Sequence, residues 1–195
     1  DDGVFIFEAP HIMDMFEHLA FDTVYHEHMS YLSLRPIAQL FERYGMEIFD
    51  AGIKPIQGHS LRAYVCRKGA RAVKPSVGMM MEEEMAAGLH KLANYRVVAR
   101  RVKELKKEVA ATVRSLKKKG NTIAAYGAPA KGNTLLNYFG FGTDMLDYAT
   151  EELPSKIGYV TPGMRIPVVD INWARKNPPD YYLLLAWNYK DAILE

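Results

Sequence analysis

Residues 122–134 read TIAAYGAPAKGNT, and this stretch decides the class of fold. Its first five residues are β-branched or apolar, as in a buried strand, and small residues follow, as in a tight loop. The helical pattern of Thr134–Phe139 completes a strand–loop–helix unit. Such a unit is typical of α/β proteins, so we predict a parallel sheet covered by helices.

Further strands and a helix extend this unit to the carboxyl end. Met145–Tyr148 and Val168–Val169 are strand candidates, and the uninterrupted apolar run Tyr181–Ala186 predicts a central parallel strand. A last helix is expected over Asn188–Leu194. Residues 121–195 are therefore predicted to form a small three-layer α/β domain of Rossmann type.

The amino-terminal block, residues 1–74, has a different order of elements. Val4–Phe7 is a short apolar strand, and residues 34–44 place Leu34, Ile37, Leu40, Phe41 and Tyr44 on one helical face that Gly45 ends. Two strands, Met46–Phe49 and Leu61–Arg67, surround a turn at residues 56–59. This block is predicted to be an α/β unit that finishes in a hairpin.

Residues 75–120 form the predicted middle segment. Lys74–Gly78 has the composition of a linker, and apolar residues then recur at spacings of three and four up to residue 118. A helix over 82–118 would extend about 55 Å at 1.5 Å per residue. Since this exceeds the width of a small domain, we expect the helix to bridge two blocks or to form a homodimer with its own copy.

Composition narrows the classes of protein. The chain has 195 residues, with 25 Lys and Arg against 23 Asp and Glu, and this near balance does not favour nucleic acid or an anionic membrane as a partner. The single cysteine, Cys66, excludes a disulfide framework and multi-cysteine metal sites. No 18-residue apolar run and no signal peptide is evident, so a cytoplasmic setting is expected. The sequence begins at Asp1 without an initiator methionine and enters a strand almost at once, which suggests a fragment.

The densest polar group of the sequence is Tyr25-His26-Glu27-His28. A neutral imidazole can accept a proton near pH 7, and a neighbouring carboxylate or tyrosine can orient it. In an extended segment Tyr25 and Glu27 would share one face, and His26 and His28 the other. A surface turn is an alternative, as is a metal site of His26 and His28 with Glu27 or His59, although no metal is expected.

The loop at 127–132 offers a second candidate site. Small residues let a backbone approach a ligand, and the amino terminus of the next helix presents free N–H groups to an anion. Lys131 adds a positive charge, and Asn133 or Thr134 could cap the helix. A phosphate contact and a merely tight turn both remain open here. Trp187 and Asn188 follow a strand, where they could line a ligand site or form a structural lid.

These motifs together resemble the S-adenosylmethionine-dependent C-methyltransferases that act on nucleotide-linked keto sugars in deoxysugar biosynthesis. The resemblance implies a partial class I methyltransferase sheet, followed by a long helix and a small Rossmann-like three-layer domain. The acidic-Gly-x-Gly loop that wraps the methyl donor is absent from this chain. The matching stretches are residues 3–8, 21–31, 60–62, 126–134, 162–163, 166–167 and 179–188.

By this resemblance, His28 is the base that removes a proton beside the sugar ketone, and Tyr25 and Glu27 assist it. At 57–60 the chain reads Gln-Gly-His-Ser, whereas the family typically reads His-Gly-Gly-Ser. Two alternatives are a non-catalytic nucleotide-sugar-binding module and a nicotinamide-dependent oxidoreductase; a metal hydrolase is a third. The residues expected to bind the substrate are His26, His59, Ser60, Arg62, Gly127, Pro129, Lys131, Asn133, Thr134, Trp187 and Asn188.

Overall fold

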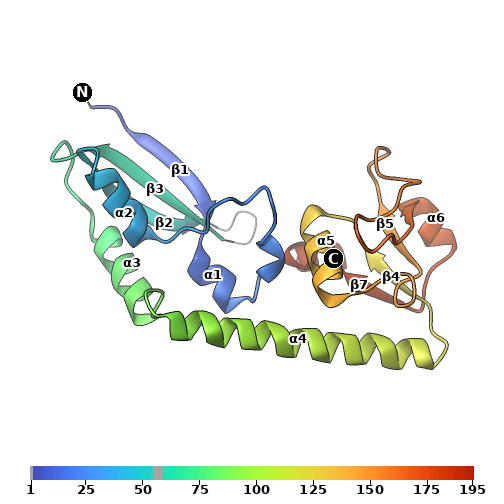
Figure 1. Ribbon diagram of the computed structural model, residues 1–195. Coiled ribbons are helices and arrows are strands. Elements are labelled where there is room, and N and C mark those ends of the chain that lie inside the picture. Colours follow the sequence, from blue (N-terminus) through green and yellow to red (C-terminus); the bar gives the residue numbers. More distant parts are fainter. Residues whose placement is uncertain (1, 55–58) are drawn as a thin grey trace. The chain divides into compact units, whose positions relative to one another are not determined.

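The computed structural model describes residues 2–54 and 59–195 (Figure 1). The chain forms two compact units. Unit 1 comprises residues 1–20 and 28–101, and unit 2 comprises residues 21–27 and 102–195. These bounds differ from the predicted divisions at 74 and 120, since the predicted middle segment is shared between both units and unit 2 includes a short stretch of the amino-terminal block.

Unit 1 is built on a three-stranded antiparallel sheet in the order β1-β3-β2. The β2–β3 pair is the predicted hairpin, with Met46 opposite Arg67, and β1 pairs with β3 so that Pro10 lies opposite Ser60. Residues 56–58 of the predicted turn lie outside the described residues. The strands are Phe5–Pro10 (β1), Met46–Lys54 (β2) and Ser60–Arg67 (β3).

Helices pack on this sheet and close its core. The buried face of α2 consists of Leu34 and Ile37 with Phe41 beside them, whereas Leu40 is exposed on the flank of the helix. The helix ends at Glu42, so Tyr44 is not on its face and is exposed, contrary to the prediction. The helices are Ile12–Glu17 (α1), Leu34–Glu42 (α2) and Pro75–Ala86 (α3).

The long helix of the prediction is two helices. Lys74–Gly78 is not a linker, because α3 already begins at Pro75 and contributes Val77 to the core of unit 1. A break follows at Gly88, which has a φ of +68° that a helix cannot continue through, and α4 runs over Leu92–Lys118. Among the helices of the described ranges, none is long and apolar enough to cross a membrane.

Unit 2 contains a four-stranded parallel sheet in the order β6-β5-β4-β7. The predicted strand Tyr181–Ala186 lies at the edge of the sheet and not at its centre, and Tyr181 is exposed there. Met145 lies in a turn before β5. The strands are Ile123–Tyr126 (β4), Tyr148–Glu151 (β5), Val168–Asp170 (β6) and Tyr181–Leu184 (β7).

Helices cover both faces of this sheet, which confirms the general α/β class. Ile123 points into a core with Val113 of α4 and Leu136 of α5, whereas Ala124 packs on the other face against Ala174 of α6. The alternation of neighbours in β4 between two faces is the pattern of a strand buried on both sides. The remaining elements are Ala130–Phe139 (α5), Ile171–Lys176 (α6), Trp187–Tyr189 (η2) and Lys190–Leu194 (α7).

Candidate functional site

The polar segment of residues 21–27 is held by unit 2. It begins with a single 3-10 turn, Phe21–Thr23 (η1), and the Phe21 ring lies 5.3 Å from the Tyr138 ring and 5.6 Å from the Phe139 ring of α5. Aromatic pairs at such distances stabilise beyond the area that they bury. Phe21 therefore anchors the segment to α5 of the parallel-sheet unit.

Asp22 provides a second anchor. Its side chain is buried, with 1% of the residue exposed, and its Oδ2 accepts a hydrogen bond of 2.8 Å from the indole N–H of Trp187. Within the described residues, no donor reaches its Oδ1 with hydrogen-bond geometry. Burying a carboxylate oxygen without a hydrogen bond lowers the stability of the fold. Asp22 is therefore a candidate for a functional role and not only for a structural one.

The pKa of Asp22 is raised above its ordinary value of 3.8, chiefly because burial disfavours the charged carboxylate. The Trp187 hydrogen bond acts in the opposite direction, as does the positive charge of Lys131. The aspartate is thus bonded to Trp187 and influenced by the charge of Lys131, two residues that are predicted to bind the substrate. Sequence reasoning included Asp22 in a motif but gave it no role.

The segment then turns where an extended strand was considered. Residues 25–27 form a bend and turn, so the alternation of faces expected for a strand does not apply. The Tyr25 ring is half-buried and lies 6.0 Å from the His26 ring, while His26 and Glu27 are exposed. Tyr25, His26 and Glu27 belong to unit 2, and the half-buried His28 belongs to unit 1.

The glycine loop after β4 is organised by its own backbone. Gly127 has a φ of +83°, and its N–H donates to the Thr150 hydroxyl of the neighbouring strand β5 over 3.0 Å. The Ala128 carbonyl accepts from the Lys156 ammonium over 3.1 Å. A side chain at position 127 would be strained at this φ, which explains the glycine without a ligand.

The small residues at the start of α5 have a packing role. The helix begins at Ala130 with Pro129 at the N-cap position, so Asn133 and Thr134 lie inside the helix and neither caps it, contrary to the prediction. Gly132 is buried, and a Cβ added there would lie 3.0 Å from Leu185. The absent side chain therefore allows α5 to approach the end of β7.

Most of the predicted substrate-binding residues of unit 2 nevertheless lie at the carboxyl ends of the parallel strands. β4 and β7 are neighbouring parallel strands, and the loop at 127–129 and the turn Trp187–Tyr189 follow their carboxyl ends. From β4 the chain continues to β5 and β6 on one side and then returns to the other side of β4 as β7. The carboxyl ends of β4 and β7 therefore form a topological switch point, where open α/β sheets bind ligands. The predicted residues found there are Gly127, Pro129, Lys131, Asn133, Thr134, Trp187 and Asn188.

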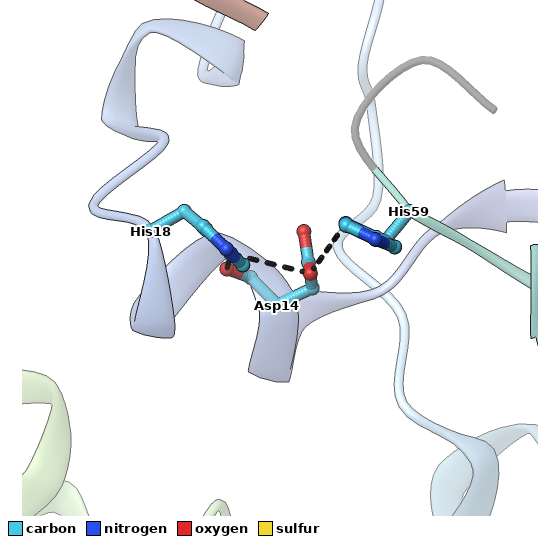
Figure 2. A group of neighbouring side chains, drawn as sticks. All are labelled: Asp14, His18 and His59. Carbon is cyan, nitrogen blue, oxygen red and sulfur yellow. Dashed lines mark hydrogen bonds and ion pairs between the residues drawn. The ribbon is translucent and has the colours of Figure 1, made fainter. Parts of the chain in front are cut away.

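The other predicted residues lie on the antiparallel sheet of unit 1. Ser60 is buried at the start of β3, and Arg62 makes an ion pair of 2.7 Å with Glu8 of β1. His59 precedes β3, and its Nδ1 lies 3.1 Å from the Asp14 carboxylate. The predicted partners of His59 in a metal site were His26 and His28, but its observed neighbours are Asp14 and His18 (Figure 2).

A buried polar network in unit 1 was also missed. Glu84 of α3 is 3% exposed, and its Oε1 accepts from the His11 imidazole over 2.9 Å and from the Leu34 N–H over 2.5 Å. Its Oε2 accepts from the Arg35 N–H over 3.2 Å. The carboxylate therefore caps α2 from another helix, in place of a local N-cap side chain.

The chain is therefore a mixed α/β protein. It combines an antiparallel sheet covered by helices with a parallel α/β unit that has polar residues at its switch point. Residues 55–195 match the family model described as C-methyltransferase C-terminal domain, and the chain belongs to this family. All 195 residues align at 35% identity with the protein "C-methyltransferase NovU" of Streptomyces niveus, of which they cover 46%. The chain thus spans about half the length of the curated relative that it matches.

Proposed function

We propose that this chain is the carboxyl-terminal part of an S-adenosylmethionine-dependent C-methyltransferase, with a nucleotide-linked keto-deoxysugar as its substrate. The observation that carries the proposal is the match along the whole chain to a relative named as a C-methyltransferase. Family membership over residues 55–195 supports it independently. In this proposal unit 1 completes a class I methyltransferase sheet and unit 2 is the Rossmann-like domain.

The proton-transfer residues of the proposal are His28, Tyr25 and Glu27. His28 accepts the proton from the carbon beside the sugar ketone: the C–H bond breaks, the proton moves to the imidazole, and the electron pair forms an enolate. Tyr25 and Glu27 orient the imidazole, and the Tyr25 hydroxyl can donate a hydrogen bond to the developing oxyanion. The turn at 25–27, anchored by Phe21 and Asp22, supports this role because it leaves Glu27 exposed to a ligand.

S-adenosylmethionine supplies an electrophilic methyl group that the enolate carbon can attack, with the thioether as leaving group. We assign none of the residues of this chain to the donor. The glycine loop of unit 2 does not suit it, since Gly132 is packed against Leu185 and a Cβ would be in contact there. The chain's own contribution is therefore substrate binding and proton abstraction.

Substrate binding is proposed for the switch-point residues of unit 2. The amino terminus of α5 presents free N–H groups, and the Lys131 ammonium adds a positive charge beside them, as a diphosphate requires. Trp187 and Asn188 follow the adjacent strand end and offer a ring face and an amide. These features support a nucleotide sugar, and they make Lys131 the residue whose loss weakens binding most.

The test uses the full-length protein that contains this chain. His28→Asn should abolish methyl transfer, and it should also abolish exchange of the acidic sugar hydrogen with deuterated solvent in the presence of S-adenosylhomocysteine. His90→Asn, an exposed histidine of unit 1, is the matched control and should retain both. Lys131→Met should raise KM for the nucleotide sugar and leave exchange at saturation largely unchanged. Solvent exchange at the wild-type rate in His28→Asn would refute the base assignment.

A further inference from the structure

Asp14, His18 and His59 bring three metal-ligating side chains together in unit 1 (Figure 2). Asp14 lies in α1, and His18 is the residue that follows its last turn, four positions later, so both side chains are on one side of the helix. His59 comes from a remote part of the chain. Pro10 pairs with Ser60, so the end of β1, from which α1 departs, lies beside the start of β3 and thus beside His59.

The distances among the ligand atoms suit one small cation. Oδ1 of Asp14 lies 3.3 Å from Nδ1 of His18 and 3.1 Å from Nδ1 of His59. In a tetrahedral zinc site with bonds of 2.0–2.1 Å, neighbouring ligand atoms are about 3.3 Å apart. All three atoms lie within 4.8 Å of one another. The two imidazole rings are stacked, 5.7 Å apart and inclined by 19°, on either side of the carboxylate (Figure 2).

We propose that Asp14, His18 and His59 form a binding site for zinc or another first-row divalent cation. Two imidazole nitrogens and one carboxylate oxygen are a ligand set that such ions favour over Mg²⁺ or Ca²⁺, which prefer oxygen. The side chains of His18 and His59 are 50% and 47% exposed, so an ion can enter from solvent and water can complete its coordination.

Two features of the cluster agree with this assignment. His59 has a φ of +68°, a conformation that a non-glycine residue adopts at a cost and that occurs often at ligand sites. In addition, Glu17 acts on Asp14 as a further negative charge, which favours a dication at this place. Metal binding would exchange the hydrogen bonds of both Nδ1 atoms, including the 3.1 Å bond of His18 to the Asp14 carbonyl, for coordination.

The ion would link α1 to the start of β3, two elements that lie far apart in the sequence. An ion that binds only the folded unit raises its apparent stability in proportion to the logarithm of its concentration. None of the ligands is the proposed base, although His59 is among the residues expected to bind the substrate. The expected readouts of the metal site are binding and stability, and they hold whether or not the protein transfers methyl groups.

The test titrates ZnCl2 into the tag-free protein by calorimetry and CoCl2 with visible absorption as the readout. We expect one ion per chain, with a Kd on the order of micromolar, and a tetrahedral Co²⁺ spectrum. His18→Gln, His59→Gln and Asp14→Asn should each weaken binding by at least about tenfold. Because His18 and His59 are about half exposed and Asn has nearly the shape of Asp, these variants should fold, and circular dichroism verifies it.

Two matched controls separate this site from other histidines. His90→Gln removes an exposed histidine elsewhere in unit 1, and the double change of His26 and His28 to Gln removes the His-x-His motif. Both variants should bind zinc as the wild type does. The proposal is overturned if the wild type binds no ion stoichiometrically, if His59→Gln binds with unchanged affinity, or if only the double variant loses binding.

Discussion

Glu84 of unit 1 and Asp22 of unit 2 are both almost fully buried carboxylates, yet their surroundings differ. Both oxygens of Glu84 accept hydrogen bonds, and two of its three donors are backbone N–H groups at the start of α2. The Oδ2 of Asp22 accepts the Trp187 N–H, and within the described residues no donor reaches its Oδ1 with hydrogen-bond geometry. Glu84 thus satisfies backbone donors of α2, whereas Asp22 retains an acceptor oxygen that could bind a further donor.

This difference separates a structural carboxylate, Glu84, from a candidate functional carboxylate, Asp22. Glu84 replaces a missing helix cap, and its backbone donors would be unsatisfied without it. Asp22 is bonded to Trp187, which follows β7 at the switch point of a parallel sheet, and burial raises the pKa of Asp22. Groups with perturbed pKa values and incomplete hydrogen bonding are enriched at functional sites, while saturated networks are mostly structural.

The largest effect is expected for Glu84→Ala. It leaves the buried His11 imidazole and the Leu34 and Arg35 N–H groups without their acceptor, which should lower the free energy of unfolding by about 3 kcal/mol. Urea denaturation measures this loss, and hydrogen exchange should quicken at Leu34. The matched control Glu83→Ala changes an exposed neighbour and should cost less than about 0.5 kcal/mol. Equal losses in both variants would contradict the structural role.

Trp187→Phe should have the next largest effect. It retains the ring but removes the indole N–H, so Asp22 loses its hydrogen bond and unfolding becomes easier by about 1–3 kcal/mol. Trp173→Phe is the control, because the Trp173 ring is about half exposed and contacts Tyr148 by its edge. An unchanged denaturation midpoint in Trp187→Phe would show that this hydrogen bond does not anchor the segment.

Asp22→Asn should have a smaller effect, and one that depends on pH. The raised pKa means that Asp22 stabilises the fold most below pH 3.8, and this contribution is lost as the pH rises through its folded-state pKa. The amide can still accept the indole N–H but does not titrate. The wild type should therefore lose stability relative to Asp22→Asn as the pH increases from about 3 to 7.

A fluorescence titration gives a direct check of the same residue. The protein has two tryptophans, so Trp173→Phe leaves Trp187 as the sole reporter. Its emission should change with a midpoint above 3.8, and the added Asp22→Asn change should remove that transition. A midpoint at or below 3.8 would contradict the burial of this carboxylate.

The smallest effect is expected at a solvated carboxylate. Glu104 of α4 is 60% exposed and accepts from the Lys107 ammonium over 2.9 Å. Water screens such a pair, so Glu104→Gln should change the free energy of unfolding by less than about 0.5 kcal/mol. If urea denaturation shows a larger loss of unfolding free energy, solvent exposure does not explain why Glu104 contributes less to stability than Glu84 and Asp22.

Local features of the fold were predictable from local residues. The β4 strand, the termination of α2 within three residues of Gly45 and the β2–β3 hairpin follow from periodicity and from glycine at a positive φ. The break at Gly88 was missed, because a helical pattern continues on both sides of a residue whose φ only the packed chain reveals. The edge position of Tyr181 was missed too, since strand order depends on partners remote in sequence.

The candidate sites divide in the same way. The sequence singled out the polar group at 25–28 and the residues that the structure places at the switch point, because unusual residue types stand next to one another there. It did not join Asp14 to His59 or Asp22 to Trp187, which are 45 and 165 residues apart. No periodicity relates such residues, and the expectation that Asn133 or Thr134 caps α5 failed because Pro129 at the N-cap position begins the helix earlier.

By itself, the sequence determined the α/β class and most strands, because hydrophobic periodicity and turn residues act over a few neighbours, and its motifs indicated the family by resemblance. Only the tertiary structure decided that residues 21–27 pack with unit 2, that Gly132 makes room for Leu185, and that two histidines face one aspartate. The physical reason is that burial and pairing depend on chain segments brought together by the packing of the cores.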